Sequence, residues 1–65
     1  MNIESIGKLV MERRKMLSVG QKEVASLSGI STHALSDLEG GKGNPTLTTL
    51  LKVCEVLGLK VCVGV

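Results

Sequence analysis

The sequence contains no phenylalanine, tyrosine or tryptophan, and its only proline is Pro45. A core without aromatic rings must be built from Leu, Ile, Val and Met side chains. A chain of 65 residues buries only about 60% of the surface that it exposes when unfolded, so such a core is marginal. Dimerisation would add buried apolar area. We therefore expect one small domain that gains stability from a second copy.

Cysteine is also scarce, since Cys54 and Cys62 are the only two. Two cysteines are too few for a disulfide framework, and neither lies in a CxxC or CxxH spacing typical of a metal site. We expect both to be buried, reduced thiols, with a redox or inter-subunit role as the alternative. No metal or cofactor is indicated by these residues.

Long apolar runs and a targeting segment are missing as well. No run approaches the roughly 18 residues of a membrane span, and the N-terminus lacks a basic-then-apolar signal pattern. The sequence predicts a cytoplasmic protein with no membrane partner. The net charge of +2 is modest, so overall charge does not identify a nucleic-acid binder, and the distribution of charge matters more.

The most informative stretch is residues 20–40, GQKEVASLSGISTHALSDLEG. It predicts helices over residues 21–28 and 32–39, joined by a turn at Gly29 and Ile30. Gly29 can take the left-handed conformation where the first helix ends, and Ser31 offers a side-chain oxygen as N-cap of the second. This is the pattern of a helix-turn-helix, whose second helix can lie in the major groove of DNA.

Two further helices flank this pair. Apolar residues spaced by three and four predict one over residues 4–17, in which Gly7 would permit a close approach by a neighbouring element. Residues 40–45 hold three glycines, an asparagine and a proline, and predict a loop. Thr46 then caps a last helix with a broad apolar face, and Gly58 ends it.

The tail, residues 59–65, reads LKVCVGV and alternates β-branched residues. It predicts one short strand. An apolar strand without a partner is a liability, so the simplest solution is antiparallel pairing with the tail of a second copy. A frayed terminus is the alternative. The dimer strand would comprise Val61, Cys62, Val63 and Val65.

The helix-turn-helix and its flanks resemble the XRE family of Cro and phage repressors over roughly residues 5–58. The residues that carry the resemblance are Gln21, Ala25, Gly29, Ile30, the run Leu35-Ser36-Asp37-Leu38-Glu39, and the loop Gly41-Lys42-Gly43-Asn44-Pro45 followed by Thr46-Leu47. The resemblance implies an all-α, lambda-repressor-like domain of four to five helices at residues 1–58. Residues 46–52 followed by a β tail are similar to the HipB-type antitoxin branch, in which the tail pairs between subunits; here that would make residues 59–65 a dimerisation strand.

The resemblance also implies the site. The expected base contacts come from Ser31, Thr32, His33, Ser36 and Asp37. The expected phosphate contacts come from Gln21, and from Lys22, Lys42 and Asn44 on the same face. Family members similar to this chain pair an arginine at the position of Arg14 with the glutamate at Glu39, which predicts a structural ion pair. The plainer alternatives are an ordinary polar helix face and a solvated arginine.

Together these expectations predict a homodimeric, sequence-specific DNA-binding regulator. It would repress transcription by binding a pseudo-palindromic operator. A compatible role is that of an antitoxin that binds a HipA-like kinase toxin. The alternative is an interaction adaptor that acts mainly through a partner protein, which the modest net charge and Asp37 favour. His33, Ser36 and Asp37 lie near one another on one predicted helix, but nothing supplies a substrate pocket or an oxyanion site, so we expect no enzyme.

Overall fold

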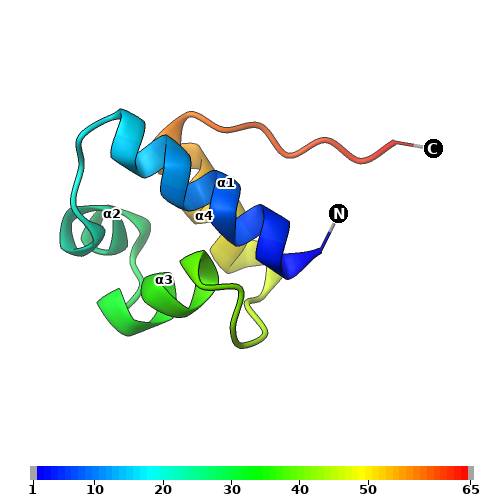
Figure 1. The fold of residues 1–65 in the computed structure, drawn as a ribbon, viewed down its shortest axis with the longest axis horizontal. Coiled ribbons are helices and arrows are strands. Elements are labelled where there is room, and N and C mark those ends of the chain that lie inside the picture. The colour runs from blue at the N-terminus through cyan, green and yellow to red at the C-terminus, as the bar shows by residue number, and fades with distance from the viewer. Residues whose placement is uncertain (1, 65) are drawn as a thin grey trace.

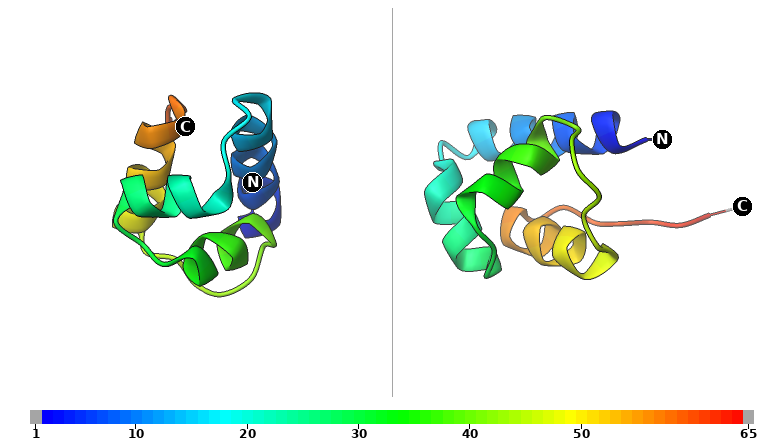
Figure 2. Two further views of the ribbon diagram at one scale, coloured as in Figure 1. Left: turned by 90° about the vertical axis from the view of Figure 1, so that its left-hand side faces the viewer. Right: turned by 90° about the horizontal axis from the view of Figure 1, so that it is seen from below.

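The computed structural model describes residues 2–64, and this part of the chain is all-α. Its four helices are α1 (Ile3–Met16), α2 (Gln21–Ser28), α3 (Thr32–Glu39) and α4 (Leu47–Leu57) (Figure 1). α1 and α4 lie side by side, and α2 and α3 cross one side of that pair (Figure 2). The predicted bounds of α2 and α3 are confirmed to the residue, and the all-α fold class is confirmed.

Side-chain caps fix where the helices begin. The Ser31 hydroxyl accepts a hydrogen bond from the Ala34 amide at 3.0 Å, and the Thr46 hydroxyl accepts one from the Thr49 amide at 3.1 Å. Both predicted N-caps are therefore confirmed. α1 begins earlier than the sequence predicted, because the Asn2 side chain accepts from the amide of Ser5 at 2.9 Å and forms a capping box with it.

Glycines end two of the helices in the left-handed conformation. Gly29 follows α2 with φ 71° and Gly58 follows α4 with φ 69°. A side chain would be strained at such a backbone angle, whereas glycine adopts it readily. Both predicted helix stops are confirmed.

The core lies where the four helices meet. Its side chains are 2% exposed or less, and they are Val10, Val24, Ala25, Leu35, Leu38, Val53 and Leu57. The apolar face of α4 is only partly covered, since Leu47 remains 65% exposed and Leu51 45% exposed. Leu9 of α1 is also 53% exposed, so both α1 and α4 carry exposed apolar side chains.

The predicted close approach at Gly7 is confirmed. Gly7 is buried in the middle of α1 at the point where the end of α3 crosses it. A Cβ atom placed there would collide with the carbonyl oxygen of Leu38. Because only a hydrogen fits in that space, the glycine sets how closely α1 and α3 can pack.

The tail lies on the side of the molecule opposite α3 (Figure 1). Its first residues, Leu59 to Cys62, line a pocket together with residues of α1 and α4. Residues 59–64 have no regular secondary structure, and Val63 is 96% exposed. A strand is defined by hydrogen bonds to a second strand, and residues 2–64 contain none, so strand pairing remains a prediction. Cys62 is exposed, so the prediction that both thiols are buried is wrong for this residue. Val65 lies outside the described residues.

Candidate nucleic-acid interface

α3 presents a polar surface on the side opposite its buried residues. Leu35 and Leu38 anchor it in the core with 1% exposure or less. Four of the predicted base-contact residues are exposed and Asp37 is partly exposed; the four are Ser31, Thr32, His33 and Ser36. An α-helix with its side chains is about 10–12 Å in diameter, so α3 could enter the ~12 Å wide major groove of B-DNA.

The turn before α3 fixes its direction relative to α2. The amide of Ile30 donates to the carbonyl oxygen of Ala25 at 3.0 Å, which closes the turn around Gly29. Ala25 is 1% exposed and lies in the core. A small residue at that position lets the two helices cross closely.

The end of α3 is held by a buried ion pair. Arg14 of α1 donates two hydrogen bonds to the Glu39 carboxylate, from Nε to Oε2 at 2.7 Å and from Nη2 to Oε1 at 3.0 Å. The two side chains are only 11% and 3% exposed. A third Arg14 nitrogen, Nη1, donates to the carbonyl oxygen of Val19 at 2.9 Å. This bidentate geometry is the stronger form of a charged hydrogen bond.

Gln21 joins this pair, which the sequence did not reveal. Its Nε2 donates to Glu39 Oε1 at 2.9 Å, so the first residue of α2 is tied to the last residue of α3. The amide nitrogen carries a second N–H, and the backbone N–H of this first helical residue has no partner within the helix. Gln21 therefore retains donors for an anion while its side chain is oriented by Glu39.

The electrostatics of the cluster keep both partners charged. Burial alone would raise the pKa of Glu39, but the hydrogen bonds from Arg14 and Gln21 outweigh it and lower that pKa. The hydrogen bond to Glu39 raises the pKa of Arg14. Glu39 is therefore a carboxylate over the whole range in which a DNA-binding domain works.

The loop after α3 brings further polar groups beside the helix. The amide of Lys42 donates to the carbonyl oxygen of Asp37 at 2.8 Å, and Gly41 and Gly43 adopt φ values of 71° and 75°. Asp37, Lys42 and Asn44 all line one groove of about 300 Å³. The loop thus gathers one predicted base contact and two predicted phosphate contacts.

The remaining predicted residues occupy two places. Lys22 is exposed at the start of α2, next to Gln21. Val61, Cys62 and Val63 lie on the tail, away from α3 (Figure 1). The structure holds no DNA and no second copy, so these assignments stay predictions.

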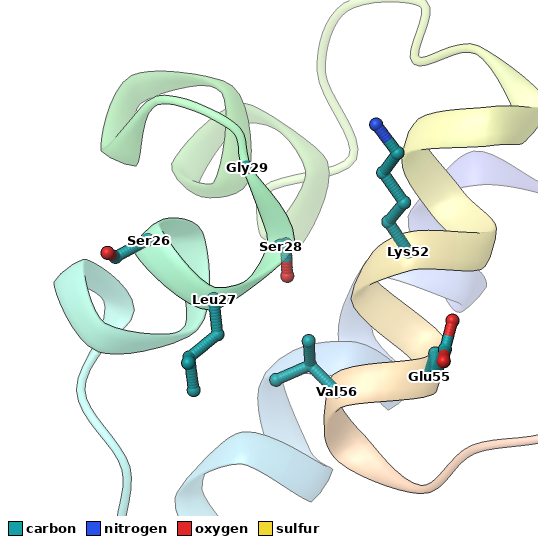
Figure 3. Close-up of a pocket in the computed structure, with 7 residues that line it drawn as sticks. All are labelled: Ser26, Leu27, Ser28, Gly29, Lys52, Glu55 and Val56. Atoms are coloured by element: carbon teal, nitrogen blue, oxygen red, sulfur yellow. The ribbon is translucent and has the colours of Figure 1, made fainter.

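A wider groove of about 540 Å³ lies between α2 and α4, and none of the predicted contact residues lines it (Figure 3). Its walls include Leu27 and Val56, with Lys52 and Glu55 at one side. Ser28 is 4% exposed, and its hydroxyl has no hydrogen-bond partner within residues 2–64. Across the same residues, no three His, Cys, Asp or Glu side chains come together as a metal site would require, and no helix is long and apolar enough to cross a membrane.

Comparison with known proteins agrees with this geometry. The sequence profile of a family described as helix-turn-helix matches residues 10–63. Over 53 residues the chain is 38% identical to the HTH-type transcriptional regulator PuuR of Escherichia coli, a match that covers 82% of this chain and 29% of PuuR. It is 37% identical over 54 residues to the uncharacterised HTH-type transcriptional regulator y4dJ of Sinorhizobium fredii, covering 83% of this chain and 70% of that protein.

An uncharacterised HTH-type transcriptional regulator of Haemophilus influenzae is 37% identical over 51 residues, which is 78% of this chain and 52% of that protein. The chain therefore spans less than a third of PuuR and about half of the Haemophilus influenzae protein. Among solved structures, the restriction-modification controller protein C.AhdI of Aeromonas hydrophila superposes with a TM-score of 0.84 at 26% sequence identity, covering 89% of this chain and 88% of that one. The relatives are transcriptional regulators.

Proposed function

Because the chain belongs to the XRE-type helix-turn-helix family, we propose that it is a sequence-specific DNA-binding transcriptional regulator with α3 as its recognition helix. The observation that carries the proposal is the exposed polar face of α3, held at its start by the Gly29 turn and at its end by Glu39. A recognition helix must hold its side chains in fixed positions relative to the DNA bases. The Gly29 turn and the Glu39 ion pair hold α3 in such a fixed position.

Base reading is assigned to the exposed side chains of α3. Thr32 and Ser36 can donate or accept at base edges, and the methyl group of Thr32 can contact a thymine methyl. His33 can donate to guanine, and Asp37 can accept from a cytosine amine. Ser31 sits at the start of the helix, where it also serves as N-cap.

Phosphate contacts would set the position of the domain on the duplex. Lys22 at the start of α2 and Lys42 in the loop after α3 are exposed cations, and Asn44 offers an amide from the same loop. Gln21 combines an oriented side chain with a backbone N–H at the positive end of α2. Each lysine that neutralises a phosphate should add about one unit to the log–log slope of affinity against salt.

We propose further that residues 1–58 form the DNA-binding domain and residues 59–65 join two copies. The exposed Val61 and Val63, and the uncovered Leu51 nearby in the chain, supply apolar area for a partner. The tail leaves the molecule on the side opposite α3, so pairing there would leave both recognition helices free. A two-fold dimer of this kind reads two half-sites of a pseudo-palindrome with centres about 34 Å apart or a multiple of that.

The test is selection of bound sequences from a random duplex DNA pool at physiological salt. We expect an enriched two-fold symmetric site, with preference at separate positions lost in Thr32→Ala and Ser36→Ala. Lys22→Ala should reduce the salt slope by about one, while the matched control Lys8→Ala, on the exposed side of α1, should leave it unchanged. A folded protein that enriches no sequence would exclude the reading helix and favour an adaptor.

A second candidate function is that of an antitoxin of the HipB type. Such a protein binds a HipA-like kinase toxin and also represses transcription of the operon that encodes both proteins. The helix-to-tail arrangement at residues 47–64 supports it, because an exposed apolar tail suits pairing between subunits and contact with a partner. The test is co-expression with the product of a neighbouring kinase-like gene. Co-purification in a defined ratio is expected, and two proteins that elute separately would exclude the role.

A further inference from the structure

Two of the α3 side chains assigned to base reading contact each other. His33 and Asp37 are one helical turn apart, and His33 Nε2 lies 3.3 Å from Asp37 Oδ2. The His33 side chain is 87% exposed and that of Asp37 is 38% exposed. A DNA duplex that received α3 would therefore meet them as a joined pair.

Asp37 is confined from the other side by the loop. Its backbone carbonyl oxygen accepts the Lys42 amide at 2.8 Å. A Cβ atom added at Gly43 would lie 3.9 Å from the Asp37 Cβ, so the loop backbone passes close to this side chain. The loop backbone and the His33 ring are thus both close neighbours of Asp37.

The hydrogen-bond inventory of the pair leaves only certain partners. At 3.3 Å from Oδ2, an Nε2–H could turn toward the carboxylate in the imidazolium and in one neutral tautomer of His33, so the contact does not require a charged ring. The second carboxylate oxygen, Oδ1, then remains as an acceptor. In the major groove only the exocyclic amines of cytosine and adenine can donate to it, and a carboxylate suits cytosine N4.

We propose that His33 and Asp37 read one operator base pair as a unit, in which His33 orients the Asp37 carboxylate to accept a hydrogen bond from the N4 amine of a cytosine. This inference rests on the proposed function of α3 as recognition helix. Asp37 is the contacting residue and His33 is its positioning residue. Without the ring, the carboxylate would turn among several rotamers and lose part of its preference.

The pair is suited to reading rather than to holding the fold. Exposed ion pairs contribute little to folding stability, and neither side chain belongs to the core cluster. Substitutions at both positions should therefore leave the domain folded. A change in base preference then reports on recognition itself.

The experiment is selection from a random duplex pool with the wild type, His33→Ala, Asp37→Ala and the double variant, each checked for folding by thermal unfolding. In the wild type we expect one position in each half-site to favour cytosine. Asp37→Ala should abolish that preference, and His33→Ala should weaken it at the same position by about fivefold or more. The double variant should lose no more there than Asp37→Ala alone.

Two further variants sharpen the result. Asp37→Asn should move the preference at that position from cytosine to adenine, since an amide pairs with adenine N6 and N7. Ser36→Ala, on the same exposed face but outside the pair, should leave the cytosine position unchanged. Both results would support the assignment of that position to Asp37.

Several results would overturn the inference. His33 and Asp37 do not act together if His33→Ala and Asp37→Ala alter base preference at different operator positions. The same follows if their losses of preference at one operator position add in the double variant. Loss of the C·G preference in His33→Ala but not in Asp37→Ala would mean that His33 donates to the guanine of that pair directly. If the wild type enriched no site at all, the proposed function would fail along with the pair, whereas an enriched site with independent effects would remove the pair alone.

Discussion

The Arg14–Glu39 pair offers the sharpest test of what holds the recognition helix. Removing one partner of a buried pair leaves the other charge without compensation and costs about 3–5 kcal/mol in a fully buried site. Glu39 is the more deeply buried, at 3% against 11% for Arg14. We therefore expect Arg14→Ala to lower the free energy of unfolding by about 3–4 kcal/mol, and Glu39→Ala by about 2–3 kcal/mol because Arg14 can turn toward solvent.

The double variant separates the pair from its parts. Arg14→Ala with Glu39→Ala leaves no uncompensated charge, so its loss should be close to that of the worse single variant. The coupling energy would then be about 2–3 kcal/mol, equal to the loss in Glu39→Ala alone. Losses that simply add would refute the view that Arg14 and Glu39 act as one unit.

The assay must suit a chain without aromatic residues. Urea unfolding followed by far-UV circular dichroism reports on the helices directly. At roughly 0.05–0.15 kcal/mol per residue, 65 residues supply only about 3–10 kcal/mol of stability. The variants should therefore be measured in trimethylamine N-oxide, which favours the folded state, with Glu39→Gln as a milder member of the series.

The same pair sets the response to acid. The pKa of Glu39 is lower in the folded protein than in the unfolded chain, so the unfolded state binds the proton first. The contribution of Glu39 is complete above the unfolded value of about 4.3 and is lost as the pH falls through the folded value. The difference in stability between wild type and Glu39→Gln should shrink over that interval, and a difference that stays constant down to acid pH would contradict the lowered pKa.

Three further substitutions or reactions test other parts of the structure. Gly7→Ala should cost about 2 kcal/mol despite the better helix propensity of alanine, because its Cβ has no space; Gly64→Ala, with nothing nearby, should leave the urea midpoint unchanged. Ser28→Ala should keep or raise stability by up to about 1 kcal/mol, because the buried hydroxyl has no partner in the described part of the chain, and a clear loss would reveal one. In a thiol-reaction time course Cys62 should react at once, and Cys54 only on unfolding, since burial shields it and raises its pKa.

Local signals in the sequence were sufficient to predict the helices. The bounds of α2 and α3 follow from Gly29 as a left-handed stop and Ser31 as a cap, both of which act over three or four residues. The start of α1 was misplaced because Asn2 and Ser5 cap each other by side-chain contacts that the apolar spacing does not reveal. The glycine at position 7 predicted a close approach, but the sequence did not identify the neighbour, which is a carbonyl group at the end of α3.

Residue spacing did not predict the long-range contacts, and the Arg14–Glu39 pair was expected only from the family resemblance. Gln21 and Glu39 are eighteen residues apart, and nothing in their spacing indicates that they meet. The same holds for Arg13, whose Nε donates to the Leu57 carbonyl oxygen at 2.9 Å and supports the end of α4. Such contacts depend on how the helices cross, which local periodicity does not specify.

The Gln21–Glu39 contact links the fold to the proposed activity. Glu39 fixes the end of α3 through Arg14 and orients the Gln21 amide at the start of α2. If Gln21 binds a phosphate, then one carboxylate sets both the register of the reading helix and the donor that positions it on the duplex. A side-chain donor that is already oriented in this way loses less conformational freedom when it binds a phosphate. Gln21→Ala should therefore weaken binding to all DNA sequences alike while Glu39→Gln, which also loosens α3, should weaken discrimination between sequences as well.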